Sequence, residues 1–135
     1  MKSFLVIGLG RFGRHLTDKL VDLGNEVMVL DQDEERVARI SNVATAACVG
    51  DCQDEQVLAS LGVRNFDACF VCISDDFQAS LEAPATLKDL GAKCVVARAD
   101  REKQIKFLKK IGADYVIHTE MDMATRVAMR FSAQN

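Results

Sequence analysis

Three glycines and one aspartate near the start of the chain have the types and spacing of a nucleotide site. Gly8, Gly10 and Gly13 follow an apolar run, and Asp31 ends a second apolar run about 20 residues beyond them. Glycines let a phosphate approach backbone N–H groups, and a carboxylate accepts hydrogen bonds from ribose hydroxyls. A turn that serves only the backbone is the competing interpretation, but the coincidence of strand, turn, helix, strand and carboxylate favours nucleotide binding.

Each of these residues has its own physical reason. Gly8 permits the sharp turn out of the first strand, Gly10 removes a Cβ from the path of a phosphate, and Gly13 lets the next helix pack close to the strand. That helix starts near Arg11, and its free N–H groups carry the positive end of the helix dipole. The charge of Asp31 would repel a 2′-phosphate, so NADP is disfavoured.

Polar residues after later apolar runs extend the predicted site. The carboxyl ends of strands line the ligand crevice of a doubly wound sheet, so Asp51, Ser74 and Arg98 are expected there. Asp51 would lie at the adenine end, although Asp51 or Asp54 could instead cap the next helix. For Arg98 the alternative is a surface ion pair with the acidic residues that follow it.

The five cysteines are an odd number and suggest no metal or disulfide framework. Cys69 and Cys72 form a CxxC pair, which is typical of redox pairs and zinc sites. They lie within one strand-like run, however, where residues three apart point to opposite faces. Both are interpreted as small buried hydrophobes. The chain adds only His15 and His118, so no structural metal is expected.

Six apolar runs with strand character alternate with helical patterns. This alternation predicts an α/β fold, a Rossmann-like doubly wound parallel sheet in the order 3-2-1-4-5-6 with a C-terminal crossover helix. The fourth run is apolar throughout, as expected for a strand buried on both faces. The predicted strands are 3–7, 26–31, 45–49, 68–73, 93–97 and 115–118.

Three of the helical segments have features of their own. Pro84 falls inside the helix expected over 77–90, where it removes a hydrogen bond at a cost of about 3 kcal/mol, so a kink or break is expected near Ala83. The lysines of the amphipathic helix 101–111 are interpreted as a solvated face. The segment 121–132 is apolar around more than one face, which favours burial against another subunit or lobe, with packing on its own sheet as the simpler alternative.

The composition indicates one domain without a strongly charged partner. The 135 residues include 17 basic and 20 acidic side chains, a net charge of −3, and no basic block stands apart. A nucleic-acid or anionic-membrane surface is therefore not expected. No apolar stretch approaches the roughly 20 residues of a membrane span, and no signal-peptide pattern precedes the first run. A soluble cytoplasmic domain without direct membrane insertion is expected.

Several motifs together resemble a known family. They are GLGRFG at 8–13, Asp31, GDCQD at 50–54, ISDDFQASLEA at 73–83 and LKKIGADYVIHTEMDMA at 108–124. Over essentially the whole chain the sequence is similar to the N-terminal lobe (RCK, KTN or TrkA-N) of proteins that regulate the conductance of potassium, and most of all to Ktr-type gating subunits of potassium uptake systems. The resemblance implies a regulatory nucleotide site rather than an enzyme. It also implies a homodimer that assembles into a ring, an octamer in the family, beneath a membrane potassium transporter at the inner face of the cell membrane.

The resemblance also assigns roles to residues. It implies Gly8, Gly10, Arg11, Phe12 and Gly13 at the phosphates, Asp31 and Gln32 at the ribose, Asp51 and Cys52 beside the adenine, and Ser74 and Arg98 completing the crevice. Arginine at position 11 resembles the subunits that respond to ATP or ADP, because a guanidinium can pair with a terminal phosphate, which NAD lacks. ATP or ADP is expected as the preferred ligand, with NAD or NADH as the alternative. Glu120 resembles a carboxylate that approaches a Mg²⁺ or Ca²⁺ ion bound with the nucleotide.

The expected organisation is a nucleotide-binding lobe at 1–119 and a crossover helix at 120–135. The chain stops at Asn135, so the usual C-terminal lobe of the family is expected to be absent, and Pro84 is expected to disturb lateral contacts. The rival function is a small NAD-dependent oxidoreductase. It is disfavoured because Tyr115 lies in a strand-like run and neither histidine has an evident catalytic partner.

Overall fold

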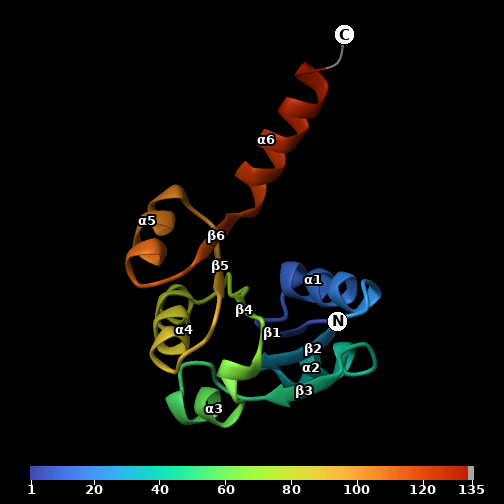
Figure 1. Ribbon diagram of the computed structural model, residues 1–135, viewed down its shortest axis with the longest axis vertical. Coiled ribbons are helices and arrows are strands. Elements are labelled where there is room, and N and C mark those ends of the chain that lie inside the picture. The colour runs from blue at the N-terminus through green and yellow to red at the C-terminus, as the bar shows by residue number, and fades with distance from the viewer. Residues whose placement is uncertain (134–135) are drawn as a thin grey trace.

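The computed structural model describes residues 1–133, and its centre is a sheet of six parallel strands (Figure 1). The strands run in the order β3-β2-β1-β4-β5-β6, which confirms the predicted order. Helices connect successive strands, because parallel neighbours need a crossover. The strands are β1 Ser3–Ile7, β2 Glu26–Asp31, β3 Ala46–Val49, β4 Ala68–Val71, β5 Val95–Ala99 and β6 Tyr115–His118. The helices are α1 Arg11–Asp22, α2 Glu34–Ile40, α3 Glu55–Ser60, the 3₁₀ turn η1 Val63–Asn65, α4 Phe77–Asp89, α5 Glu102–Lys110 and α6 Thr119–Ser132.

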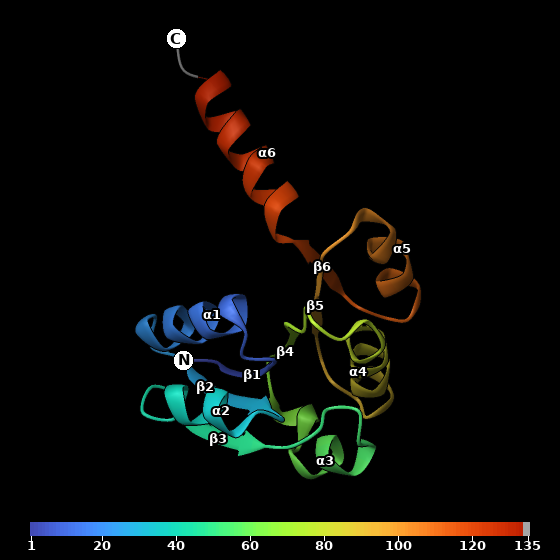
Figure 2. The ribbon, with the colours of Figure 1, turned by 180° about the vertical axis from the view of Figure 1, so that it is seen from behind.

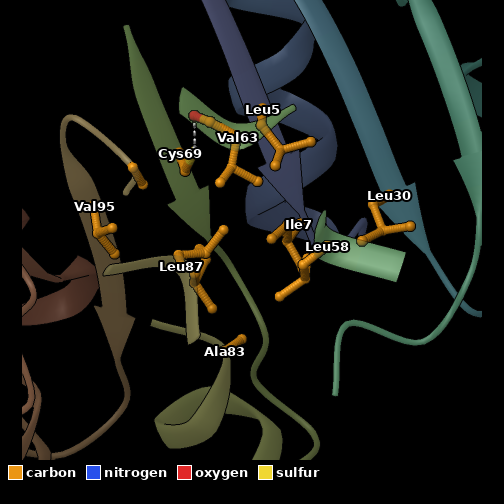
Figure 3. Packing of buried hydrophobic residues seen from close by; sticks show 11 residues of the cluster. Leu5, Ile7, Leu30, Leu58, Val63, Cys69, Ala83, Leu87 and Val95 are labelled. Carbon is orange, nitrogen blue, oxygen red and sulfur yellow. Dashed lines mark hydrogen bonds between the residues drawn. The ribbon is translucent and has the colours of Figure 1, made fainter. Parts of the chain in front are cut away.

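The sheet separates two apolar layers. Helices α3 and α4 pack on one face, where Leu58 and Leu87 meet Leu5 and Ile7 of β1 (Figure 3). Helices α1 and α2 pack on the other face, and Figure 2 shows them beside β1 and β2. The chain reaches both faces because successive strand residues alternate in direction. The central strands are therefore apolar on both sides.

Cys69 and Cys72 belong to different layers of the core. Cys69 packs with the α3 and α4 layer, and Cys72 with the α1 and α2 layer. This confirms that the CxxC pair points to opposite faces of the sheet. Burial raises the pKa of each thiol to about 12, so both remain protonated at neutral pH. They are apolar core residues in practice.

The fifth strand lies two residues further along the chain than expected. It begins at Val95 and ends at Ala99, so Arg98 is inside the strand and not after it. Arg98 is paired in register with Ile117 of β6. The carboxylate of Asp114 accepts a hydrogen bond from the N–H of Val95 at 2.7 Å, which ties the start of the strand to the turn before β6. A contact between distant segments thus sets the limits of β5.

The expected break at Ala83 does not occur. Helix α4 continues from Phe77 to Asp89 with Pro84 inside it. Ala83 and Pro84 lie on its buried side, and Ala83 belongs to the core beside Leu87. Burial of this face against the sheet offsets the hydrogen bond that proline removes, which costs about 3 kcal/mol. Tertiary packing has overridden a local preference.

Helix α6 projects away from the rest of the molecule (Figures 1 and 2). None of its residues is buried, and Met129 and Phe131 are 68% and 63% exposed. The simpler expectation, packing on its own sheet, is therefore wrong for these residues. The last two positions of the predicted helix 120–135 lie outside the described residues. Within residues 1–133, none of the helices combines the length and apolar character that a membrane span needs.

Candidate functional site

A cleft of about 160 Å³ opens at the carboxyl end of β1, between the ends of β2 and β4. The connections after β1 and β4 leave in opposite directions there, and this switch point is where open α/β sheets bind ligands. Five aspartates and one arginine line the cleft. Of the predicted site residues, it brings together Gly8, Gly10, Asp31, Gln32, Asp51, Cys52 and Ser74.

Two of the three motif glycines are required by the fold itself. Gly8 has φ +93°, and a Cβ there would lie 3.0 Å from the carbonyl carbon of Cys72. A Cβ on Gly13 would collide with the carbonyl oxygen of Gly8. Both glycines therefore allow the close approach of β1, α1 and β4 that the motif predicted.

Gly10 has no such structural reason. Its φ of −68° suits any residue, and no atom lies within 4 Å of where a Cβ would stand. It occupies the N-cap of α1, where no side chain within residues 1–133 accepts a hydrogen bond from the first turn. A serine or aspartate there would satisfy those N–H groups internally. Glycine keeps them free for an anion beside the cleft.

Asp31 connects the glycine turn to the loop after β2. It is only 8% exposed, and its Oδ2 accepts a hydrogen bond from the N–H of Leu9 at 2.7 Å. Its Oδ1 accepts one from the N–H of Asp33 at 2.8 Å. A carboxylate offers about four lone-pair positions, so two remain for a ligand. Asp31 is thus both a structural residue and a cleft-lining acceptor.

Arg36 is a cleft residue that sequence reasoning missed. Its guanidinium lies 3.8 Å from carboxylates of Asp31, Asp33 and Asp75, and it is the only cation among the cleft-lining residues of the described chain. Asp75 follows β4, whereas Arg36 follows β2, so this ion pair spans the end of β1. The available signal was an arginine in the first turn of α2, five residues after Asp31.

The neighbouring aspartates divide into capping residues and cleft residues. Asp54 caps α3 by accepting a hydrogen bond from Gln56 N–H, and Asp76 caps α4 in the same way. Asp51 accepts a bond from Gln53 N–H at 2.9 Å and lines the cleft. Of the two aspartates that the sequence offered as the N-cap of α3, Asp54 is the cap, and Asp51 lies in the cleft.

Cys52 lines the cleft as a neutral thiol. Burial, followed by the nearby charge of Asp51, raises the pKa of Cys52 to about 12. The thiolate is the reactive form of cysteine, so this residue is poorly suited to nucleophilic or metal chemistry. Within residues 1–133, no three or more His, Cys, Asp or Glu side chains are grouped to hold a metal ion.

Arg98 lies beside the site without lining the cleft. Its guanidinium carbon stands 5.7 Å from the centre of the Phe12 ring, and a nitrogen lies 3.4 Å from Asp100. Its Nε is buried and has no hydrogen-bond partner within residues 1–133. Arg98 thus supports the first turn of α1 through Phe12, and the alternative of an ion pair with a following acidic residue is realised.

The other predicted residues stand apart from the cleft of their own chain. Arg11 is exposed at the first position of α1, and Gly13 is buried in that helix. Glu120 is exposed in the first turn of α6. A second hollow, of about 250 Å³, adjoins the first through Ser74 and reaches Asp100 after β5 and Gln104 in the first turn of α5. Ser74 therefore borders both.

The sequence matches the family model of the TrkA-N domain over residues 4–119. It is 43% identical to Ktr system potassium uptake protein C of Bacillus subtilis over 134 residues, which cover 99% of this chain and 61% of that protein. It is 40% identical to Ktr system potassium uptake protein A of the same organism, again over 99% of this chain and 60% of that protein. The chain thus spans about 60% of the length of these relatives.

Solved structures share the fold at lower identity. The NAD(P)-binding domain of an exopolyphosphatase-related protein from Archaeoglobus fulgidus has a TM-score of 0.86 at 19% identity, covering 99% of this chain and 100% of that one. The GsuK channel bound to NAD has a TM-score of 0.76 at 20% identity, over 86% of this chain and 21% of that one. GsuK bound to ADP gives 0.75 at 19% identity, over 87% and 31%.

Proposed function

The chain belongs to the TrkA-N domain family, and we propose that it is the nucleotide-binding regulatory lobe of a gating subunit for a membrane potassium transporter. The observation that carries the proposal is Gly10. The fold does not need a glycine at this N-cap, whereas a phosphate does, because a side chain would block or satisfy the free N–H groups. The names of the Ktr relatives support potassium uptake as the process that is regulated.

The nucleotide is proposed to bind along the cleft with its phosphates at α1. Gly8, Gly10, Phe12 and Gly13 would supply backbone contacts or close approach there, and the dipole of α1 would stabilise the negative charge. The ribose would lie against Asp31 and Gln32, and the adenine against Asp51 and Cys52. Ser74 would lie on the other side of the cleft. Arg98 would hold the first turn of α1 in place through Phe12. The five aspartates of the cleft favour this orientation of the nucleotide. Their carboxylates repel the phosphates, whereas the ribose hydroxyls can donate hydrogen bonds to them.

We further propose that ATP or ADP is preferred over NAD or NADH. GsuK has been solved with NAD and with ADP, so this fold accepts both classes. Arg11 at the start of α1 distinguishes them, because its guanidinium can pair with a terminal phosphate. Glu120 is proposed to approach Mg²⁺ or Ca²⁺ from a second copy of the chain, since it does not line the cleft of its own.

The exposed α6 supports assembly of copies. On the sheet face against which α1 packs, Tyr115 of β6 is 65% exposed and Ile117 is only half-buried, because α6 does not cover them. Met129 and Phe131 of α6 are exposed as well. We propose that residues 120–135 cross to a second copy and cover this face, while 1–119 form the nucleotide lobe. The dimers would form a ring, an octamer, at the cytoplasmic side of a membrane transporter. A further C-terminal lobe would be supplied by the rest of a longer protein or be absent.

Calorimetric titration with ATP, ADP, NADH and NAD, with and without Mg²⁺, tests the proposal. Gly10→Asp is the decisive variant, because aspartate is a favoured N-cap and should stabilise α1 by a few tenths of a kcal/mol relative to glycine, while its charge repels phosphates. His15→Asp, on the exposed side of α1, is the matched control for charge. We expect Gly10→Asp to lose nucleotide binding with its melting temperature kept or raised, and the control to bind as wild type.

Two results would decide against parts of this function. If Gly10→Asp binds ADP as tightly as the unmodified chain, the phosphates do not lie at α1. Arg11→Ala is expected to remove most of the preference for ATP or ADP. An unchanged preference would show that Arg11 does not determine which nucleotide binds more tightly. Hydride transfer from NADH to a substrate panel is expected to be absent, and turnover would favour the oxidoreductase alternative.

A further inference from the structure

Arg36 connects the two walls of the nucleotide cleft. Its Nη1 lies 3.8 Å from Oδ2 of Asp31, which ends β2, and its Nη2 lies 3.8 Å from Oδ2 of Asp75, in the loop after β4. Its Nε lies 3.8 Å from Oδ2 of Asp33, the N-cap of α2. Because β1 runs between β2 and β4, these contacts cross the carboxyl end of β1, where the cleft opens (Figure 1). We refer to the contact between the two walls as the Arg36–Asp75 bridge.

The side chains of this bridge lie at different depths. The side chain of Asp31 is 7% exposed, that of Arg36 is 36% exposed and that of Asp75 is 70% exposed. The carboxylate to which the ribose is assigned is therefore at the floor of the cleft. The guanidinium lies between this floor and the rim, and Asp75 is at the rim.

The bridge leaves the acceptors of Asp31 available to a ligand. At 3.8 Å the contacts of Arg36 are longer than hydrogen bonds, so charge alone holds them. The hydrogen bonds of Asp31 come from the backbone N–H groups of Leu9 and Asp33, and two lone pairs remain. A ribose hydroxyl can therefore bond to Asp31 without displacing Arg36.

A forked cation suits this position. The guanidinium presents its nitrogens in a fixed plane, and three of them face three different carboxylates. Without a cation between them, Asp31 and Asp33 on one wall would repel Asp75 on the other. The guanidinium therefore removes a repulsion that would otherwise hold the two walls apart.

We propose that the Arg36–Asp75 bridge is a gate across the nucleotide cleft, which opens when a nucleotide enters or leaves and closes over the ribose that is bound at Asp31. This inference rests on the proposed function, because it needs a nucleotide at that carboxylate. The bridge is closed in the nucleotide-free chain and compatible with a bound ribose, so it slows entry and exit alike. It therefore sets the rate of exchange and leaves the affinity unchanged.

Surface plasmon resonance with ADP flowed over the immobilised full chain measures both rate constants. In Arg36→Gln and in Asp75→Asn, association and release should both become about two- to fivefold faster, because a partly exposed ion pair contributes little free energy. The dissociation constant should stay unchanged, and the double variant should be no faster than either single variant. At about 1 M salt, where the Debye length is about 3 Å, the difference between the variants and the unmodified chain should shrink.

Two features of the test separate a gate from an effect of net charge. The two substitutions change the charge in opposite directions, so charge alone would slow the association of anionic ADP with Arg36→Gln and speed it with Asp75→Asn. Glu35 and Arg39 are the matched control pair, since they lie 3.7 Å apart on α2, are exposed and do not line the cleft. Arg39→Gln and Glu35→Gln should keep both rates of the unmodified chain.

Each outcome has a defined meaning. Faster association and release in both single variants, with the affinity kept and no further change in the double variant, support the gate. Faster release with unchanged association would make Arg36 a contact of the ligand, and unchanged rates, additive effects or association rates that move in opposite directions also overturn the gate. If the unmodified chain binds no ADP, the proposed function fails and the gate fails with it. Binding of ADP with unchanged rates in Arg36→Gln refutes the gate alone.

Discussion

Replacing Asp31 by Asn is expected to destabilise the fold even when no nucleotide is present. The carboxylate is 8% exposed and accepts two backbone N–H bonds, from Leu9 at 2.7 Å and from Asp33 at 2.8 Å. Asparagine keeps one oxygen acceptor, but its NH₂ group must face the other N–H. One backbone donor is then left without an acceptor in a buried site.

The magnitude follows from these two bonds. A hydrogen bond to a charged group contributes about 1.5–3 kcal/mol, and a buried unsatisfied donor costs about 1–3 kcal/mol. The ion pairs of Arg36 at 3.8 Å add little, because they are long and partly exposed. We therefore expect a loss of about 2–4 kcal/mol in the free energy of unfolding, a large part of the 5–15 kcal/mol typical of a domain.

Urea denaturation of the nucleotide-free chain measures this loss. The midpoint should fall while the slope of the transition is unchanged. Asp33→Asn is the matched control, because Asp33 caps α2 on the surface and asparagine caps equally well. A midpoint for Asp31→Asn within the scatter of that control would refute the structural role assigned to the carboxylate. Loss of nucleotide binding in this variant must be interpreted together with its stability.

Three further outcomes are expected. Gly13→Ala should lose about 3 kcal/mol of stability, measured by thermal unfolding, because its methyl group would meet the carbonyl oxygen of the preceding turn; an unchanged melting temperature would contradict this. The thiol of Cys72, whose pKa burial raises to about 12, should react with a disulfide reagent at pH 8 only after the chain opens, and rapid reaction of the folded chain would contradict its burial. Partial desolvation of Asp114 opposes its charge, but hydrogen bonds from Val95 N–H and Lys88 outweigh it and lower the pKa of that carboxyl below its ordinary 3.8. Asp114 therefore contributes fully to the free energy of unfolding above pH 3.8, and this contribution is lost as the pH falls through the lowered pKa. Plotted against pH, the free energies of unfolding of wild type and Asp114→Asn should converge at low pH and diverge at higher pH.

Much of the nucleotide cleft was predictable because its parts are local. The glycine turn, the helix that starts at Arg11 and the carboxylate that ends β2 all lie within 30 residues, and each depends on neighbours in the chain. Strand alternation then placed Asp51 and Ser74 at the same edge of the sheet, and both line the cleft. The sheet order follows from the rule for crossovers.

The errors concern contacts between segments far apart in the sequence. The limits of β5 depend on Asp114, nineteen residues beyond Val95, and the continuity of α4 through Pro84 depends on burial against the sheet. Arg36 became a cleft residue only because β2 and β4 flank β1 and bring Asp75 within 3.8 Å. No local pattern of residues carries that information.

The turn, the alternation of strand and helix and the carboxylate of Asp31 follow from local sequence, because backbone freedom and side-chain periodicity act over a few residues. Three features are visible only in the folded molecule: Arg36 spans the cleft, Arg98 supports α1 through Phe12, and α6 stands free of its own sheet. Those features depend on which distant surfaces meet. That choice is made by the burial of the whole core, with Leu5 and Ile7 at its centre, and not by any one segment.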